Sequence, residues 1–392
     1  MNLTAPEEVG FSSARLSRIQ PTMQKYIDDE KLAGIVTLIA RHGQVIHLEK
    51  VGMQNKETDN LLSFDTLFRI YSMTKPITSV ALMMLHEQAR FHLADPVSTY
   101  LPAFEQVKVY EYGKLVDPVR PMTIHDLLTH TSGLVYGWGD APVDKLYQDA
   151  ELLAPNVSST EFIQRLAQLP LKFHPGMVWS YSVSTDLVGY LVEVIADMPF
   201  WDYLQENIFS PLGMNDTSFS VPAGKIDRLA TNYGPCETNK IKAIDLPEES
   251  QYAKPMVRQS GGGGLISTMA DYYRFAQLVL NRGELDGVRL LGPKTVELMT
   301  QNHLPSYMFP LAIGDPMPGI GFGLGFSVIT DLPLTRMAGS PGNYGWGGAA
   351  NTQFWIDPVE DLLAIIMLQY MPSGTYPVVS DFQSLVYQAV IS

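Results

Sequence analysis

The stretch from Ser72 to Gln88, SMTKPITSVALMMLHEQ, is the most informative part of the chain for its fold. It is apolar through most of its length, and residues 81–85 (ALMML) are good helix formers rather than strand formers. Pro76 is compatible with a helix because it falls near the first turn, where a missing N–H costs least. The stretch therefore predicts a buried helix that begins close to Ser72.

Both ends of the chain carry strand patterns. Residues 34–52 contain two β-branched runs around Arg41-His42-Gly43, which predicts a hairpin, and residues 12–30 have the apolar spacing of an amphipathic helix. Towards the other end, strands are predicted at 322–330, 352–356 and 363–369, and a closing helix at 378–390. We therefore expect one sheet assembled from the two ends of the chain.

The middle of the chain has mainly helical patterns, at residues 123–129, 160–169, 184–196 and 268–280, separated by Pro- and Gly-containing connections. Gly261 to Gly264 is expected to form a turn close to other backbone. The fold class is therefore α/β (α+β): an antiparallel sheet flanked by helices. We expect residues 1–95 plus 316–392 to form a discontinuous sheet domain, and residues 96–315 a mostly helical inserted region.

Composition and charge exclude several classes of protein. Of 392 residues, 46% are hydrophobic and 17% charged, which is ordinary for a globular chain. The net charge of −14 disfavours nucleic acid as a partner. Cys236 is the single cysteine, so neither an intramolecular disulfide nor a cysteine-ligated metal site is expected. There is no apolar run of membrane-spanning length and no basic segment followed by an apolar run near the start, which predicts a cytoplasmic protein.

Ser72-Met73-Thr74-Lys75 is the only S-x-x-K motif in the chain. At the start of a helix, this spacing puts the hydroxyl and the amine on one face. A serine hydroxyl is a poor nucleophile until a neighbouring base takes its proton, and an amine held in its neutral form is such a base. One such spacing is about what chance supplies, but a lysine at the head of a buried helix indicates a function.

Several motifs in the same order give the sequence a wider resemblance. They are SMTKP from Ser72, DPV from Asp95, TIHDLLTHTSGL from Thr123, PG from Pro175, WSYS from Trp179 and YGWGG from Tyr344. With these motifs, the chain resembles the serine β-lactamase-like superfamily and, within it, the class C-like family VIII carboxylesterases. The resemblance spans nearly the full chain. It implies a β-lactamase/transpeptidase-like fold with the active site between the sheet domain and the helical region.

The resemblance also implies roles for individual residues. Tyr181 matches the family tyrosine that shares proton transfer with Lys75, although a core aromatic is the alternative, and which of the two groups is the base stays open. The stretch Trp346-Gly347-Gly348-Ala349 matches a strand that lines the site in the family. The backbone N–H groups of Ser72 and Ala349 are accordingly expected to form the oxyanion hole.

Substrate binding is expected at Trp346, Gly347, Gly348 and Val183. Val183 stands where an amide-recognising asparagine is usual in the β-lactamases, and Trp346 where a cation is usual. Both departures favour neutral, apolar groups over β-lactams. We therefore expect a carboxylesterase for small, neutral, short-chain esters that forms an acyl-enzyme on Ser72, with weak β-lactamase activity and no metal or cofactor.

Three alternatives remain open from the sequence. The acyl-enzyme could serve a class C-like β-lactamase, or a D-aminopeptidase or acyltransferase of the same superfamily. A non-catalytic binding or scaffold protein could keep the fold without turnover. A Ser-His-Asp hydrolase of the α/β type is disfavoured because the chain contains no G-x-S-x-G pentapeptide. His130 is predicted to be structural, since it ends a predicted helix.

Overall fold

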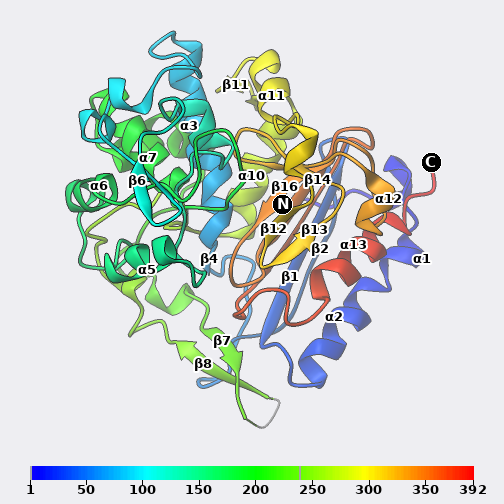
Figure 1. Ribbon diagram of the computed structural model, residues 1–392. Helices are drawn as coiled ribbons and strands as arrows, with labels where there is room; N and C mark the ends of the chain where they lie inside the picture. Colours follow the sequence, from blue (N-terminus) through cyan, green and yellow to red (C-terminus); the bar gives the residue numbers. More distant parts are fainter. Residues whose placement is uncertain (1, 238–239) are drawn as a thin grey trace.

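A computed structural model describes residues 2–237 and 240–392; Met1, with which the predicted sheet domain begins, lies outside them. Within the described residues, eight strands form one sheet in the order β14-β15-β16-β17-β18-β1-β2-β3, and each neighbouring pair is antiparallel (Figure 1). The chain start supplies β1 (Gly34–Arg41), β2 (Gln44–Asn55) and β3 (Asn60–Leu61). The chain end supplies β14 (Ile320–Phe322), β15 (Ser327–Ile329), β16 (Tyr344–Gly347), β17 (Gln353–Asp357) and β18 (Leu362–Leu368). The predicted sheet from both chain ends is confirmed.

The two ends meet where β1 pairs with β18, from Ile35 opposite Leu368 to Arg41 opposite Leu362. Side chains alternate along β1, so that Val36 and Leu38 belong to one hydrophobic core and Ile35 and Ile39 to another. The sheet is therefore buried on both faces, which explains why these strands are apolar runs rather than alternating patterns.

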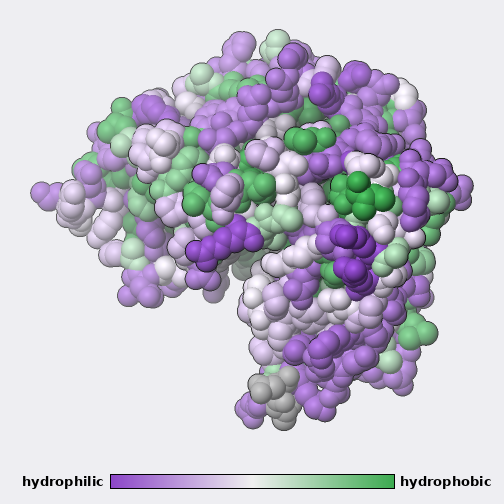
Figure 2. All heavy atoms as spheres, turned by 90° about the vertical axis from the view of Figure 1, so that its right-hand side faces the viewer, coloured by the Kyte–Doolittle hydropathy of each residue, from purple (hydrophilic) through white to green (hydrophobic). Residues whose placement is uncertain are grey.

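Helices cover each face of the sheet. The face with Ile35 and Ile39 packs against α1 (Ser13–Leu16), α2 (Ile19–Asp28) and α13 (Val378–Tyr387), at the right of Figure 1. Seen from that side, the molecule is mostly hydrophilic, with hydrophobic residues only in small scattered groups (Figure 2). The other face packs against α3 (Thr74–Glu87) and α10 (Met269–Leu280). Helix α3 confirms the buried helix predicted from Ser72.

The region between the two sets of strands is mostly helical, as predicted. Its helices are α4 (Ile124–Leu128), α5 (Pro142–Asp149), α6 (Ser159–Ala167), α7 (Ser184–Ala196), α8 (Phe200–Leu204), α9 (Ser210–Leu212), α10 and α11 (Pro293–Met299). It also holds short two-stranded pairs: β5 (Val109–Glu111) with β6 (Lys114–Val116), β7 (Asn232–Pro235) with β8 (Ile241–Asp245), β10 (Glu284–Leu285) with β11 (Val288–Arg289), and β12 (Leu311–Ile313) with β13 (Asp315–Met317). One short helix, α12 (Leu332–Thr335), lies between β15 and β16.

The predicted single strand at 322–330 is wrong. The chain forms the two antiparallel strands β14 and β15 there, with Phe322 opposite Ser327. Gly325 has φ +93°, a conformation that glycine adopts without strain, and it lies in the turn between the two strands. The helix predicted at residues 12–30 is divided into α1 and α2. The remaining predicted strands and helices are present, with ends shifted by a few residues.

A small strand pair holds the segment before Ser72. Phe68–Arg69 (β4) pairs with Ile266–Ser267 (β9), which follows the glycine-rich turn. Arg69 is fully buried, and its Nε lies 2.7 Å from Asp245 Oδ2. This pair ties the start of α3 to the residues after Gly264.

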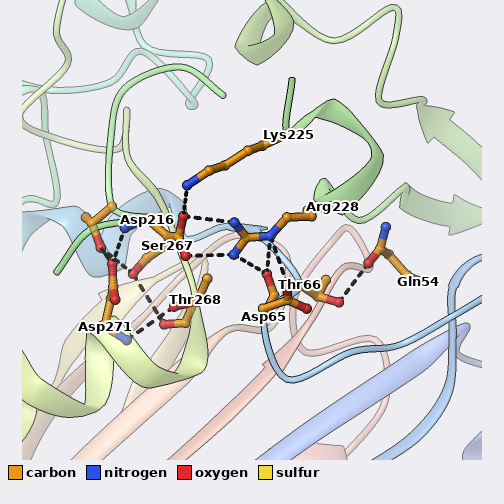
Figure 3. Close-up of polar contacts among 10 residues, drawn as sticks. Gln54, Asp65, Thr66, Asp216, Lys225, Arg228, Ser267, Thr268 and Asp271 are labelled. Carbon is orange, nitrogen blue, oxygen red and sulfur yellow. Dashed lines mark hydrogen bonds and ion pairs between the residues drawn. The ribbon is translucent and has the colours of Figure 1, made fainter. Parts of the chain in front are cut away.

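A network of ion pairs and hydrogen bonds contacts β9 through Ser267 (Figure 3). The Arg228 guanidinium binds both oxygens of Asp216, at 2.9 and 2.7 Å, and Lys225 donates to the same carboxylate. Asp271 accepts from the Asp216 backbone N–H and from the Thr217 hydroxyl, which itself bonds the hydroxyl of Ser267 in β9. The network therefore holds the segment around Asp216 against the residues that position the glycine-rich turn.

Among the helices of the described ranges, none has both the length and the apolar character required to span a bilayer.

Candidate active site

Ser72 lies in a 3₁₀ turn, Tyr71–Met73, that runs directly into α3. Tyr71 has φ +43°, an uncommon conformation for a side chain of this size. Such a conformation persists only where the surrounding fold maintains it, and it recurs at active sites. The turn leaves Ser72 half-buried while Met73 and the first turn of α3 are fully buried. Ser72 is thus the partly exposed residue at the start of a buried helical segment.

Lys75 is fully buried, and its Nζ has three polar neighbours. It lies 3.2 Å from Ser72 Oγ, 2.9 Å from the Tyr136 hydroxyl and 2.6 Å from the carbonyl oxygen of Gly262. The carbonyl can only accept, so one N–H of Lys75 is committed to Gly262. If a second N–H points at Tyr136, the lone pair of a neutral amine points at Ser72. This geometry suits removal of the Ser72 proton.

Tyr181 lies over the same amine, in the segment just before α7. The Lys75 Nζ is 4.5 Å from the centre of the Tyr181 ring, and the Tyr181 hydroxyl accepts a hydrogen bond from Trp346 Nε1 at 3.2 Å. Among the described residues, no hydrogen bond joins Tyr181 to Ser72. The structure therefore brings Ser72, Lys75, Tyr181 and Trp346 together, with Lys75 as the group that contacts the serine hydroxyl.

Tyr136 is a site residue that the sequence analysis missed. Its hydroxyl binds Lys75, and its ring stacks on Trp138 with centroids 4.5 Å apart. Burial, together with the nearby Asp186 carboxylate, raises the pKa of the Tyr136 phenol well above its usual value, so this group stays neutral. It follows the TIHDLLTHTSGL motif by two residues, but no spacing rule links that position to Lys75.

His130 is buried, and its Nδ1 lies 3.1 Å from the Ser182 hydroxyl. The centre of its ring lies 4.9 Å from the ring centre of Tyr181 and 5.3 Å from that of Phe322. Burial and the charge of Lys75 lower the pKa of His130 well below its usual value. A neutral, enclosed histidine that supports Tyr181 agrees with its predicted structural role.

The glycine-rich turn supplies the carbonyl that binds Lys75, and Asp186 of α7 supports that turn. Asp186 Oδ1 accepts from the Ser260 hydroxyl at 2.5 Å and from the Gly262 N–H at 3.4 Å. A Cβ on Gly262 would lie 2.3 Å from Asp186 Oδ2, so a larger residue there would displace the Asp186 carboxylate. The predicted close turn is confirmed, and its contact with Asp186 explains how the Gly262 carbonyl reaches Lys75.

We predict that Asp186→Ala lowers kcat about 10–100-fold with little change in KM. The substitution leaves the Ser260 hydroxyl and the Gly262 N–H without their acceptor, so the carbonyl that orients Lys75 can move. Asp186→Asn keeps an acceptor oxygen and is expected to recover most of the activity. Steady-state kinetics of both variants on one ester is the measurement. Equal losses in the two variants would mean that the negative charge, and not the hydrogen bonds, is what matters.

The end of β16 lies against the backbone that precedes Ser72. A Cβ on Gly348 would come within 2.5 Å of the Ile70 carbonyl oxygen, and the Gly348 N–H donates to Thr352 at 2.7 Å. Ala349 comes directly after Gly348 in the sequence. This close approach brings it to the same cavity as Ser72, which has a volume of about 250 Å³. Trp346, Gly347 and Gly348 do not line that cavity, although Trp346 contacts Tyr181.

Val183 is not part of the Ser72 cavity either. It is buried at the start of α7 and lines a second cavity of about 340 Å³. The two cavities share Tyr136, Leu153 and Ala154 as lining residues. In the described residues, no group of three His, Cys, Asp or Glu side chains is placed to hold a metal ion.

Comparison with known proteins places these features in a family. The model of the beta-lactamase family matches residues 19–387. The chain is 35% identical to Protein Rv1367c of Mycobacterium tuberculosis over 365 residues, covering 90% of each chain. It is 28% identical to Esterase EstB of Burkholderia gladioli over 387 residues, covering 92% of each. The solved structure of EstCE1, described as a hydrolase with promiscuous acyltransferase activity, superposes with a TM-score of 0.84 at 26% identity, covering 95% of this chain and 99% of that one.

Proposed function

Because this chain belongs to the beta-lactamase family and is a serine hydrolase, we propose that it cleaves small, neutral carboxylic esters through an acyl-enzyme on Ser72. The observation that carries the proposal is the contact of 3.2 Å between Lys75 Nζ and Ser72 Oγ at the end of a buried helix. An esterase and a hydrolase among its relatives support the same chemistry.

The proposed reaction has two steps. In the first, Ser72 Oγ bonds to the carbonyl carbon and its proton passes to Lys75; the bond to the leaving oxygen then breaks, and the proton returns to that oxygen to release the alcohol. In the second, water bonds to the acyl carbon and gives up its proton to the same amine; the bond between the acyl carbon and Ser72 Oγ then breaks to release the acid, and the amine returns the proton to Ser72 Oγ. Tyr181 and Tyr136 hold the amine between these transfers.

Negative charge on the carbonyl oxygen has to be stabilised in both steps. We assign this to the backbone N–H groups of Ser72 and Ala349, which belong to the two segments that line the same cavity. The close approach of Gly348 to Ile70 supports the assignment, because it fixes the distance between the two segments. The reaction then takes place between the sheet-bearing ends of the chain and the helical region.

Aromatic side chains favour a neutral substrate. Trp138 stacks on Tyr136 and lines the Ser72 cavity, while Trp346 contacts Tyr181 in place of a cation. We propose that β-lactams, which carry a carboxylate, are turned over weakly. The net charge of −14 supports the proposal that nucleic acid is not a partner, and we propose a cytoplasmic location.

The test compares turnover of p-nitrophenyl acetate with turnover of a chromogenic cephalosporin by the wild-type protein. A p-nitrophenyl alkylphosphonate is then used to label the nucleophile, which peptide mass spectrometry locates. We expect ester turnover to exceed cephalosporin turnover and the label to be on Ser72. Strong cephalosporin turnover would make the protein a β-lactamase, and a failure to label Ser72 would favour a non-catalytic member of the family.

Acyl transfer is a second candidate for the fate of the acyl-enzyme, since EstCE1 is described as having promiscuous acyltransferase activity. In the same assay, a short alcohol is added and the products are separated. Hydrolysis that proceeds at full rate without the alcohol supports an esterase. Turnover that requires the alcohol supports a transferase.

A further inference from the structure

A second cavity lies next to the one that contains Ser72. It has a volume of about 340 Å³, within the range of about 300–1,000 Å³ that is usual for small-molecule sites. Its lining residues are Tyr136, Tyr147, Glu151, Leu152, Leu153, Ala154 and Val183. Tyr136, which binds Lys75, forms a wall of both cavities, together with Leu153 and Ala154. The two cavities are therefore adjacent, and these three residues lie between them.

The buried part of the cavity is lined by apolar side chains, and its exposed edge carries a carboxylate. Tyr147, Leu152 and Val183 are all at least 96% buried and present rings and aliphatic side chains. Glu151 is exposed and is the only carboxylate of this lining. Burial of an apolar chain in such a cavity is favourable, whereas a chain that ends in a carboxylate is repelled by Glu151.

We propose that this cavity, the Tyr147–Val183 cavity, is the subsite for an extended, unbranched acyl chain of the substrate. The inference rests on the proposed esterase function and refines it from short-chain esters to esters of medium-chain acids. The acyl group is the part that stays bonded to Ser72 after the alcohol departs, so it needs apolar space beside the serine, which Leu152 and Val183 provide. The alcohol needs a way out, and we assign this to the part of the Ser72 cavity lined by Trp138, which is 68% exposed.

The test uses a series of p-nitrophenyl esters from acetate to octanoate on the wild-type protein, with Ser72→Ala as the background to subtract. Each methylene that becomes buried is worth about fourfold in kcat/KM. We expect hexanoate to exceed acetate by about tenfold or more, with a maximum where the chain fills the cavity. Leu152→Phe narrows only the second cavity and is expected to lower the hexanoate-to-acetate ratio by about tenfold.

Leu146→Phe is the matched control, since it makes the same change in the same segment at an exposed position outside both cavities. Its hexanoate-to-acetate ratio should equal that of the wild type. A second series varies the alcohol, from methyl to hexyl acetate. If Leu152→Phe changes preference along the alcohol series and not along the acyl series, the cavity binds the alcohol and the acyl assignment is overturned.

A measurement on the wild type alone covers the case in which Leu152→Phe does not fold. Methyl- and hexylphosphonate esters are compared by their rates of labelling Ser72, and the structure of the hexyl adduct is determined. A faster hexyl reagent with its chain against Leu152 and Val183 supports the proposal, and a chain directed towards Trp138 overturns it. An equal hexanoate-to-acetate ratio in wild type and Leu152→Phe refutes the subsite alone, whereas the absence of Ser72-dependent turnover of every ester refutes the esterase function itself.

Discussion

Replacing Ser72 with alanine is expected to lower kcat/KM for p-nitrophenyl acetate by about 10⁴-fold or more. The hydroxyl is the atom that bonds to the acyl carbon, and the methyl group of alanine cannot do so. Binding of the ester should change little, because the cavity of about 250 Å³ keeps its other lining residues. The measurement is steady-state kinetics with the variant purified away from any wild-type protein.

Ser79→Ala is the matched control for this substitution. Ser79 is buried in α3, the helix that follows the turn with Ser72, and its hydroxyl has no hydrogen-bond partner among the described residues. Loss of an unsatisfied hydroxyl should leave stability and turnover close to those of the wild type. Ester turnover that survives in Ser72→Ala, at a rate similar to that of Ser79→Ala, would mean that another residue is the nucleophile.

Replacing Lys75 with methionine is expected to lower kcat by about 10³-fold. Methionine has a similar length and an apolar end, so it fits the buried position while removing the amine that contacts Ser72 Oγ. Folding should tolerate the change, because an apolar side chain of similar size fills the buried position. Lys50→Met on β2, where Lys50 Nζ donates to the Leu62 carbonyl, provides the control and should retain full activity.

The same experiment separates the two candidates for the base. Tyr181→Phe removes the hydroxyl that accepts from Trp346 but leaves the ring over Lys75. We expect a smaller loss in Tyr181→Phe than in Lys75→Met, since Lys75 is the group in contact with the serine. A larger loss in Tyr181→Phe would reverse the assignment and make Tyr181 the base.

Much of the fold could be predicted because each pattern has a local cause. The apolar run from Ser72 became α3, and the apolar stretches at the two chain ends became adjacent strands, since strands buried on both faces need apolar side chains throughout. The prediction failed at residues 322–330, where a strand pattern continues on both sides of Gly325. The amino-acid composition of residues 322–330 suits either one long strand or two strands joined by a tight turn. The structure has the turn, in which Gly325 adopts a positive φ.

The candidate site divides in the same way. The sequence by itself determined the Ser72 and Lys75 pair, because residues three apart on one helix must share a face whatever the rest of the chain does. It could not determine that Tyr136 and Gly262 meet at the Lys75 amine, or that Asp186 supports Gly262, since these contacts join residues 61 to 187 positions apart. Those contacts, and the cavity that Val183 lines, exist only when α3, α7 and the glycine-rich turn have packed together, because packing of distant segments has no local sequence pattern.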